Sequence, residues 1–173
     1  MIYLIIVLFL LPFAVGGLLA APWFPTKRSE IKRIREEVDL KDGMVVYDLG
    51  CGDGRVLFEL IKKNPKIIAI GSEIAFWILI PAYLRKWLGG RKYKNVHFKV
   101  ANFYKQDLSD ADIVFVFLRE HVHIKLQDKF KKELKDDCLV VAAAWPVGDI
   151  EPQRILEQKD CLPIFVYQAK QLK

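Results

Sequence analysis

A glycine-rich turn that follows a short apolar run limits what this chain can fold into more than any other feature. The run Val45–Leu49 predicts a buried strand, and the apolar residues of 56–61 predict a helix. Between them, Gly50, Gly52 and Gly54 stand at alternate positions. Glycine adopts the positive φ of a sharp turn without a Cβ clash and lets a ligand lie against the main chain. The free N–H groups at the start of the helix favour a negative group of that ligand, such as a carboxylate.

Two acidic residues discriminate between the cofactors that suit this turn. A dinucleotide site usually has the pattern G-x-G-x-x-G, with the pyrophosphate at the helix start. Here the pattern is G-x-G-x-G, with one acid at the strand end and a second inside the turn. Two carboxylates this close would repel a pyrophosphate, whereas S-adenosylmethionine carries an ammonium, a sulfonium and no phosphate. The turn therefore favours S-adenosylmethionine as the cofactor, and the residues predicted to bind it are Asp48, Gly50, Cys51, Gly52, Asp53 and Gly54.

The ends of the next two predicted strands add candidate cofactor contacts. Glu73 stands 19 residues after Gly54, just beyond a strand predicted over 66–70. An acid in this place can accept hydrogen bonds from both ribose hydroxyls; the alternative is a Glu that caps the next helix. A strand predicted over 96–100 is followed by Asn102 and Phe103. We expect Asn102 to bind the edge of the adenine ring and Phe103 to stack on its face.

The remaining apolar patterns predict a doubly wound α/β domain. A strand over 112–118 is apolar throughout, as in the centre of a parallel sheet. Ligands of such a sheet bind at the carboxyl ends of its strands, so residues 117–120 are expected to face the transferable methyl. The other elements expected are a helix over 29–38 capped by Ser29, helices over 76–87 and 123–134, a strand over 139–145, and an antiparallel edge pair near 154–158 and 164–167.

Two shorter features allow alternative interpretations. The helix over 76–87 is unusually apolar. We expect it to be buried against the sheet, and a face resting on a membrane is the alternative. His121 and His123 are separated by one residue, but two histidines alone are a weak metal signal. We interpret them as the start of a helix on the domain surface and expect no metal site.

The first 26 residues contain no Asp, Glu, Lys, Arg or His and are apolar almost throughout. A membrane span needs about 20 such residues, and basic residues follow at once, from Lys27 onward. By the positive-inside rule we predict a transmembrane anchor over 1–24 that holds the chain in membrane lipid, and a catalytic domain over 25–173 on the cytoplasmic side of this single-pass protein. A cleavable signal peptide is the alternative, but no basic side chain precedes the apolar run.

Composition limits the compartment and the partners. Three cysteines, an odd number, provide no disulfide framework and fit a reducing compartment. The net charge of +6 is spread over clusters such as 62–63, 91–94 and 129–135, which are expected to be solvated. Beside an anionic membrane leaflet, the same clusters could hold the domain against lipid headgroups. No nucleic-acid-binding module is recognised, so no nucleic-acid partner is expected.

The string D-L-G-C-G-D-G at 48–54 resembles the first motif of class I S-adenosylmethionine-dependent methyltransferases. Within that class the chain resembles a smaller family of archaeal broad-specificity protein-lysine methyltransferases and mitochondrial lysine methyltransferases, which act on the c-ring protein of ATP synthase and on the adenine nucleotide translocase. The matching segments are 24–26, 46–55, Glu73, 102–104, 107–109, 132–134 and Trp145-Pro146. The resemblance implies a Rossmann-like, seven-stranded class I methyltransferase sheet over essentially all of 25–168. Ile74 and the charged residues 119–121 depart from the family's pattern, and these departures concern the identity of the methyl acceptor more than that of the cofactor.

The resemblance further implies methyl transfer from S-adenosylmethionine to the ε-amine of a protein lysine, with membrane proteins among the candidate partners. Only a neutral amine can attack, so the site needs a desolvated channel that lowers the pKa of the amine and orients it. Phe117, Leu118 and Trp145 are the expected walls of this channel, and Pro25 with Thr26 forms its expected lid. A lipid or a lipophilic small molecule is the alternative acceptor. An NAD-dependent oxidoreductase or a non-catalytic nucleotide-binding module is the alternative from another class.

Overall fold

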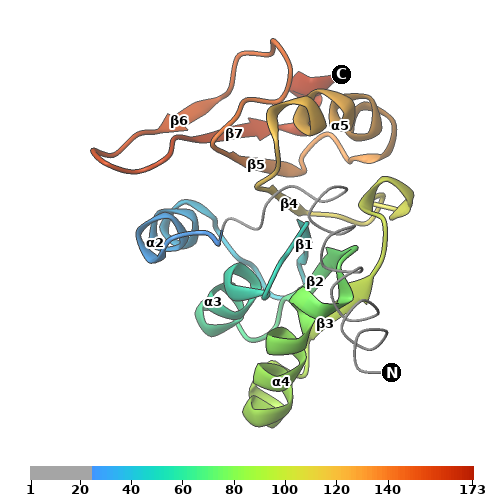
Figure 1. The fold of residues 1–173 in the computed structure, drawn as a ribbon. Helices are drawn as coiled ribbons and strands as arrows, with labels where there is room; N and C mark the ends of the chain where they lie inside the picture. The colour runs from blue at the N-terminus through green and yellow to red at the C-terminus, as the bar shows by residue number, and fades with distance from the viewer. Residues whose placement is uncertain (1–24) are drawn as a thin grey trace, which may run out of the picture.

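A seven-stranded sheet forms the centre of the protein (Figure 1). The computed structural model describes residues 25–173. The strand order is β3-β2-β1-β4-β5-β7-β6; β1 to β5 are parallel, and β7 runs antiparallel to both of its neighbours. The strands are β1 (Val45–Leu49), β2 (Ile68–Glu73), β3 (Val96–Val100), β4 (Ile113–Val116), β5 (Leu139–Ala143), β6 (Arg154–Leu156) and β7 (Ile164–Gln168). The predicted Rossmann-like seven-stranded sheet and its antiparallel edge pair are confirmed.

Helices cover both faces of this sheet. The helices α2 and α3 contribute to the buried cluster on one face, and α5 contributes to the cluster on the other. The α-helices are α2 (Arg28–Glu37), α3 (Arg55–Lys63), α4 (Ile80–Gly89) and α5 (Glu120–Glu133). Short 3₁₀ helices are η1 (Phe76–Leu79), η2 (Gly90–Tyr93), η3 (Phe103–Lys105) and η4 (Ala169–Leu172).

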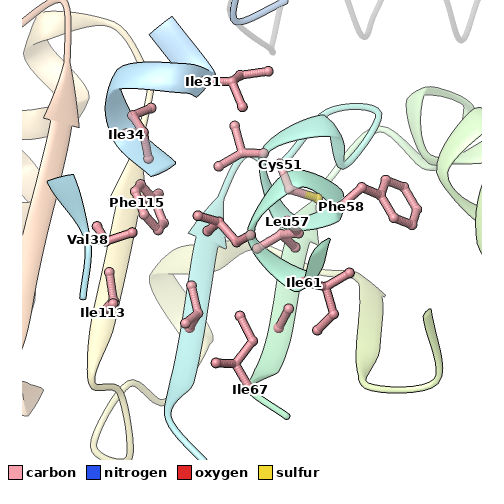
Figure 2. Packing of buried hydrophobic residues seen from close by; sticks show 14 of the residues in the cluster. Ile31, Ile34, Val38, Cys51, Leu57, Phe58, Ile61, Ile67, Ile113 and Phe115 are labelled. Carbon is pink, nitrogen blue, oxygen red and sulfur yellow. The ribbon is translucent and has the colours of Figure 1, made fainter. Parts of the chain in front are cut away.

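The first hydrophobic core lies between the sheet and the α2–α3 layer (Figure 2). Successive side chains of a strand point to opposite faces of the sheet. Ile113 and Phe115 of β4 therefore share one face, where they form a buried cluster with Ile34 of α2 and Leu57 of α3. This packing fixes both helices against the sheet near the glycine turn, which begins at the carboxyl end of β1.

The second core lies on the α5 side of the sheet. Val114 and Val116, the alternate residues of β4, cluster there with Leu126 and Phe130 of α5. Because both faces of the strand are covered, β4 is apolar at every position, as the continuous run in the sequence predicts. The strand itself is shorter than predicted and ends at Val116, which leaves Phe117 in the loop before α5.

The observed helix starts differ from two of the predictions. The helix α2 begins at Arg28 with Lys27 as its N-cap, so Ser29, the predicted cap, lies inside the helix. The backbone N–H of Lys27 donates to the Glu30 carboxylate, 2.7 Å from Oε2, and this contact favours the earlier start. The helix α5 begins at Glu120, three residues before its predicted start.

The apolar segment over 76–87 is not buried as expected. It forms η1 and then α4, and most of its large apolar side chains remain exposed. The expected burial is wrong because α4 packs against the domain through Ala82 and through the side chains of Arg85 and Lys86 instead.

The predicted transmembrane anchor requires correction. Its residues, 1–24, lie outside the part of the chain that the structure describes. Within residues 25–173, no helix is long and apolar enough to cross a membrane. A span needs about 20 consecutive apolar residues, and even α5, with 14 residues, carries several Lys and Glu side chains. The transmembrane part of the predicted fold and the single-pass membrane localisation are therefore withdrawn.

Candidate cofactor and acceptor site

The glycine turn between β1 and α3 has the backbone geometry that was expected. The φ angle is +78° at Gly50, +55° at Gly52 and +71° at Gly54, left-handed values that residues with a Cβ rarely adopt. The N–H groups of Gly50 and Cys51 both donate to the carbonyl of Ser72, over 2.8 and 3.1 Å. These two hydrogen bonds hold the turn against the carboxyl end of β2.

Neighbouring side chains also require glycine at two of these positions. A Cβ on Gly54 would lie 2.5 Å from the ring of Phe98 on β3, and a Cβ on Gly50 would lie 2.7 Å from Cδ2 of Leu118 after β4. Carbon atoms pack favourably at about 3.5–4.0 Å. The turn is therefore enclosed between β3 and the loop after β4, with no room for side chains at these two positions.

Asp48 is the most deeply buried acid of the site. It is the one charged residue of β1 and is 6% exposed. Burial, together with the negative charges of Glu73 and Asp53, raises the pKa of Asp48 to about 7. A cation beside this carboxyl group would favour its ionised form, so the site suits a positively charged ligand.

Glu73 lies at the end of β2 and contacts the turn directly. Its Oε2 accepts a hydrogen bond from the N–H of Gly52 over 3.3 Å, and its Oε1 accepts one from the N–H of Ala75 over 3.0 Å. The side chain is buried, at 8% exposed. Glu73 thus joins the cofactor turn to the segment that leads into η1. The N-cap of η1 is Ala75, so Glu73 does not cap the next helix, and its contact with the ribose stays a prediction.

Arg55 is a site residue that the sequence analysis did not single out. Its guanidinium binds both carboxylate oxygens of Asp53, with Nη2 2.6 Å from Oδ2 and Nε 2.9 Å from Oδ1. Nη1 donates to the carbonyl of Thr26 over 3.2 Å. Partial burial by itself would raise the pKa of Asp53, but the hydrogen bonds and positive charge of Arg55 hold it below its usual value. The only signal in the sequence was the position of Arg55 two residues after Asp53.

A pocket lies between the turn after β1 and the carboxyl end of β4. The strand order reverses between β1 and β4, and open α/β sheets bind their ligands at such a reversal. The polar side of the pocket consists of Asp48 and residues 50–53, and its apolar side consists of residues 115–117 with Val141 and Ala143 of β5. Residues 25–26 and Ile34 of the α2 region lie in the lining, and Arg55 and Val56 of α3 complete it.

The pocket brings together most of the predicted site residues. Those in its lining are Thr26, Asp48, Gly50, Cys51, Gly52, Asp53 and Phe117. Gly54 and Glu73 lie outside the lining, Gly54 as the last residue of the turn and Glu73 as its hydrogen-bond partner. Burial raises the pKa of the Cys51 thiol well above its usual value, so this side chain contributes shape to the pocket and no thiolate.

Three more predicted residues, Asn102, Phe103 and Trp145, also lie outside the lining. Asn102 lies after β3, and its Oδ1 accepts a hydrogen bond from the N–H of Tyr104 over 3.0 Å. Phe103 packs against Tyr104 with ring centroids 4.7 Å apart. Trp145, after β5, is 44% exposed. Their contacts with the adenine ring and with the acceptor stay predictions.

His123 was predicted to lie on the domain surface, and this prediction is wrong. Its side chain is completely buried. Nδ1 lies 2.9 Å from the carbonyl oxygen of Trp145, which can only accept, so Nδ1 carries the proton; Nε2 accepts a hydrogen bond from the N–H of Leu118 over 3.2 Å. One imidazole therefore joins the loop after β4 to the loop after β5. Burial lowers the pKa of His123, which favours this neutral form.

The residues of this pocket fit S-adenosylmethionine. Asp48 and Glu73 are buried acids beside a turn whose glycines leave the main chain accessible, and the cation of the lining, Arg55, is already bound to Asp53. A cationic methyl donor would pair with the acids, whereas a pyrophosphate would be repelled by them.

Comparison with known proteins decides the family. A family model described as the ANTKMT methyltransferase domain matches residues 48–154, more than half of the chain. The chain belongs to this methyltransferase family. The predicted family and the predicted cofactor, S-adenosylmethionine, are confirmed, and the oxidoreductase alternative is excluded.

Individual relatives agree with this assignment. A protein-lysine N-methyltransferase of Saccharolobus islandicus is 29% identical over 80% of this chain and 86% of its own length. The adenine nucleotide translocase lysine N-methyltransferase of Mus musculus is 27% identical over 80% of this chain and 59% of its own length. In fold, the chain is similar to the crystal structure of an RNA methyltransferase from Salinibacter ruber in complex with S-adenosyl-L-homocysteine, with a TM-score of 0.78, 24% identity, and coverage of 84% of this chain and 94% of that one.

Proposed function

We propose that this methyltransferase transfers a methyl group from S-adenosylmethionine to the ε-amine of a lysine in a protein. The observation that carries the proposal is the two-sided pocket, in which the buried Asp48 and the partly buried Asp53 face an apolar wall at the sheet's reversal point. The names of the two relatives, both lysine N-methyltransferases similar over 80% of this chain, support lysine as the acceptor.

The acidic side of the pocket would hold the cofactor. S-adenosylmethionine supplies a sulfonium methyl group that a neutral amine attacks in line, so that the new nitrogen–carbon bond forms as the carbon–sulfur bond breaks. Asp48 offers a carboxylate to the positive charges of this cofactor, and the N–H groups at the start of α3 favour its carboxylate. Glu73, which the N–H of Gly52 holds beside the turn, would accept the ribose hydroxyls.

The apolar side of the pocket would prepare the amine. A lysine ε-ammonium that enters beside Phe117, Val141 and Ala143 loses its hydration, and this lowers its pKa and favours the neutral, nucleophilic form. No side chain then needs to remove a proton during the transfer itself. His123 is unsuited to do so, because both of its ring nitrogens are hydrogen-bonded to the backbone.

Thr26 and Arg55 would close the pocket at the α2 end. Thr26 is 8% exposed, and Arg55 binds its carbonyl while neutralising Asp53. This contact supports a lid next to the turn that would hold the cofactor, where it would exclude water from the reacting groups.

Methyl transfer to separated cell fractions tests the proposal. The full-length protein is incubated with methyl-tritiated S-adenosylmethionine and a detergent-treated lysate of cells that lack it, and the protein, lipid and RNA fractions are then counted. We expect label in protein, at ε-N-methyllysine by mass spectrometry; the detergent keeps membrane proteins, one predicted partner class, within the assay. The control is Gly52→Arg, which places a long side chain at a position with φ of +55° in the pocket lining. Label that accumulates in lipid or RNA would contradict the proposal.

A further inference from the structure

The helix α4 presents its apolar side to solvent. Ile80, Tyr83, Leu84, Trp87 and Leu88 follow the i, i+3, i+4, i+7, i+8 spacing that normally marks the core-facing side of a helix. Here they are 55%, 45%, 54%, 77% and 71% exposed. We call these five residues the apolar stripe.

The inward side of α4 is occupied by other groups, so the stripe cannot turn toward the core. Ala82 is fully buried. The guanidinium of Arg85 lies 4.4 Å above the ring of Phe58 and 3.5 Å from the carboxylate of Glu59 on α3. The ammonium of Lys86 donates to the carbonyl of Val96 on β3. The exposure of the stripe is thus a consequence of how α4 packs, rather than of a loose helix.

Further apolar side chains are exposed on the segments of the fold that neighbour α4. Ile74 and Phe76, which lead into α4, are 58% and 56% exposed, and Val100 at the end of β3 is 56% exposed. Figure 1 shows α4 beside β3, the outermost strand on this side of the sheet. An exposed apolar surface of this kind marks an interaction site in a folded protein.

The chain segment that carries the stripe has charged side chains of one sign. From 74 to 106 the chain contains no Asp or Glu, and the basic residues of this segment are Arg85, Lys86, Arg91, Lys92, Lys94, Lys99 and Lys105. Arg91, Lys92 and Lys94 directly follow α4 and are exposed. A partner for this surface must therefore combine apolar groups with negative charge.

We propose that α4 is an interfacial helix that docks the protein onto an anionic lipid surface. An apolar stripe with a Trp at its most exposed position and cations at its border is the arrangement of helices that lie in the plane of a membrane interface. The stripe would enter the boundary of the acyl chains while the following Arg and Lys residues bind lipid phosphates. Because α4 has ten residues, too few to cross a membrane, the helix would lie in the plane of the membrane surface. A second copy of the chain fits less well, because the two basic borders would repel each other.

Vesicle binding by the full-length protein tests this assignment. Sedimentation is measured with vesicles of phosphatidylcholine alone and with vesicles that also contain phosphatidylglycerol. The wild type should bind the anionic vesicles more tightly, and added salt should weaken that binding. The double variant Leu84→Glu, Trp87→Glu should bind them at least about tenfold more weakly, because it removes two large apolar side chains from the contact.

A matched variant and a local readout identify the surface. Ile124 on α5 is as exposed as Leu84, at 54% for each, so Ile124→Glu is the matched control for the single variant Leu84→Glu: it adds the same single charge elsewhere and should bind like the wild type. Brominated lipids should quench the tryptophan fluorescence of Trp87, which is the part of the emission that the variant Trp87→Phe lacks. Retained affinity for S-adenosylmethionine shows that each variant is folded.

Three outcomes would overturn the proposal. Equal binding of the double variant and the wild type would mean that another part of the chain binds the vesicles. Equal binding to neutral and anionic vesicles would remove the argument from charge. Self-association of the wild type that the double variant abolishes, without vesicle binding, would assign the stripe to a second copy of the chain.

Discussion

Two buried ionisable side chains, Asp48 in the pocket lining and His123 between the loops after β4 and β5, respond to pH in opposite ways. Asp48 holds its proton to a higher pH than an ordinary carboxyl group, and His123 gives up its proton at a lower pH than an ordinary imidazole. Burial is the largest cause in both cases, since it penalises the charged form of either group. The role of each of these two groups can therefore be tested separately through its own pH dependence.

We predict that cofactor binding depends on the ionisation of Asp48. Its pKa of about 7 without a bound cation means that a proton must leave before the carboxylate can pair with one. Affinity for S-adenosylmethionine should rise by up to about tenfold per pH unit below pH 7 and level off above it. Titration calorimetry across this range measures the effect.

The variant Asp48→Asn should bind the cofactor weakly and without this pH dependence. It should also be the more stable protein at alkaline pH. The folded state of the wild type keeps the Asp48 proton between the ordinary value of 3.8 and about 7, so its stability falls as the pH rises through that window. An equally steep pH dependence of binding in Asp48→Asn would assign the proton to another group.

We predict that His123→Asn destabilises the protein by about 1–3 kcal/mol at pH 7.5, because the partly buried N–H of Leu118 loses its acceptor. The wild type should also lose stability as the pH falls below 6.5. The unfolded state then binds a proton at its ordinary pKa of 6.5, while the buried ring, with its lowered pKa, does not.

Urea denaturation at pH 5.5 and 7.5 measures both parts of this prediction. The destabilisation caused by His123→Asn should be smaller at pH 5.5, since the variant has no imidazole to protonate. A pH-independent difference between the two proteins would show that folding does not lower the pKa of His123. His121→Asn, an exposed neighbour, is the control.

At the scale of elements, the glycine turn depends on conformation and on space together. Gly54 has φ of +71° and packs against the ring of Phe98, whereas Gly43, in the turn before β1, has φ of +82° and no atom within 4 Å of where a Cβ would lie. The same substitution at the two positions separates the two requirements. Gly43→Ala tests the backbone angle alone, and Gly54→Ala tests the angle and the crowding.

We predict that Gly54→Ala lowers the free energy of unfolding by about 1–3 kcal/mol more than Gly43→Ala does, because the added methyl group must displace the ring of Phe98. Gly54→Ala should also weaken binding of S-adenosylmethionine, and Gly43→Ala should leave it unchanged. Chemical denaturation and calorimetry on the two variants provide the comparison. Equal destabilisation would mean that the ring moves aside at no cost.

At the scale of the whole molecule, the sheet order creates the site. The neighbours β1 and β4 are far apart in the sequence, yet they are paired, with Tyr47 opposite Val114. Their carboxyl ends place the glycine turn and Phe117 on two sides of one pocket. Cofactor binding therefore connects segments from both halves of the chain and should stabilise the domain as a unit.

We predict that S-adenosylmethionine raises the melting temperature and that NAD does not. At about 100 times its dissociation constant, a ligand of the folded state adds about 2.7 kcal/mol. For a domain of about 150 residues, this corresponds to a rise of about 5–11 °C. Differential scanning fluorimetry of the full-length protein measures both ligands side by side. A comparable shift with NAD would contradict the acidic-pocket argument.

The sequence by itself determined the local units of this protein. The strand–turn–helix unit at 45–61, its acids, and the apolar runs of β2 to β5 follow from rules that act over a few residues: positive φ at glycine, and burial of continuous apolar runs. The same rules identified the class of cofactor, because Asp48 and the glycines stand next to one another in the chain. Even the antiparallel edge pair was evident from its two short apolar runs.

Only the tertiary structure decided which distant groups meet. Arg55 binds Thr26 across 29 positions, and His123 binds Trp145 across 22. The tertiary structure also decided the orientation of α4. Its periodicity predicts an apolar side, but that side faces solvent because Arg85 and Lys86 occupy the inward position. Hydrogen bonds and packing between separate elements leave no periodic trace in the sequence, since each partner alone resembles an ordinary surface residue.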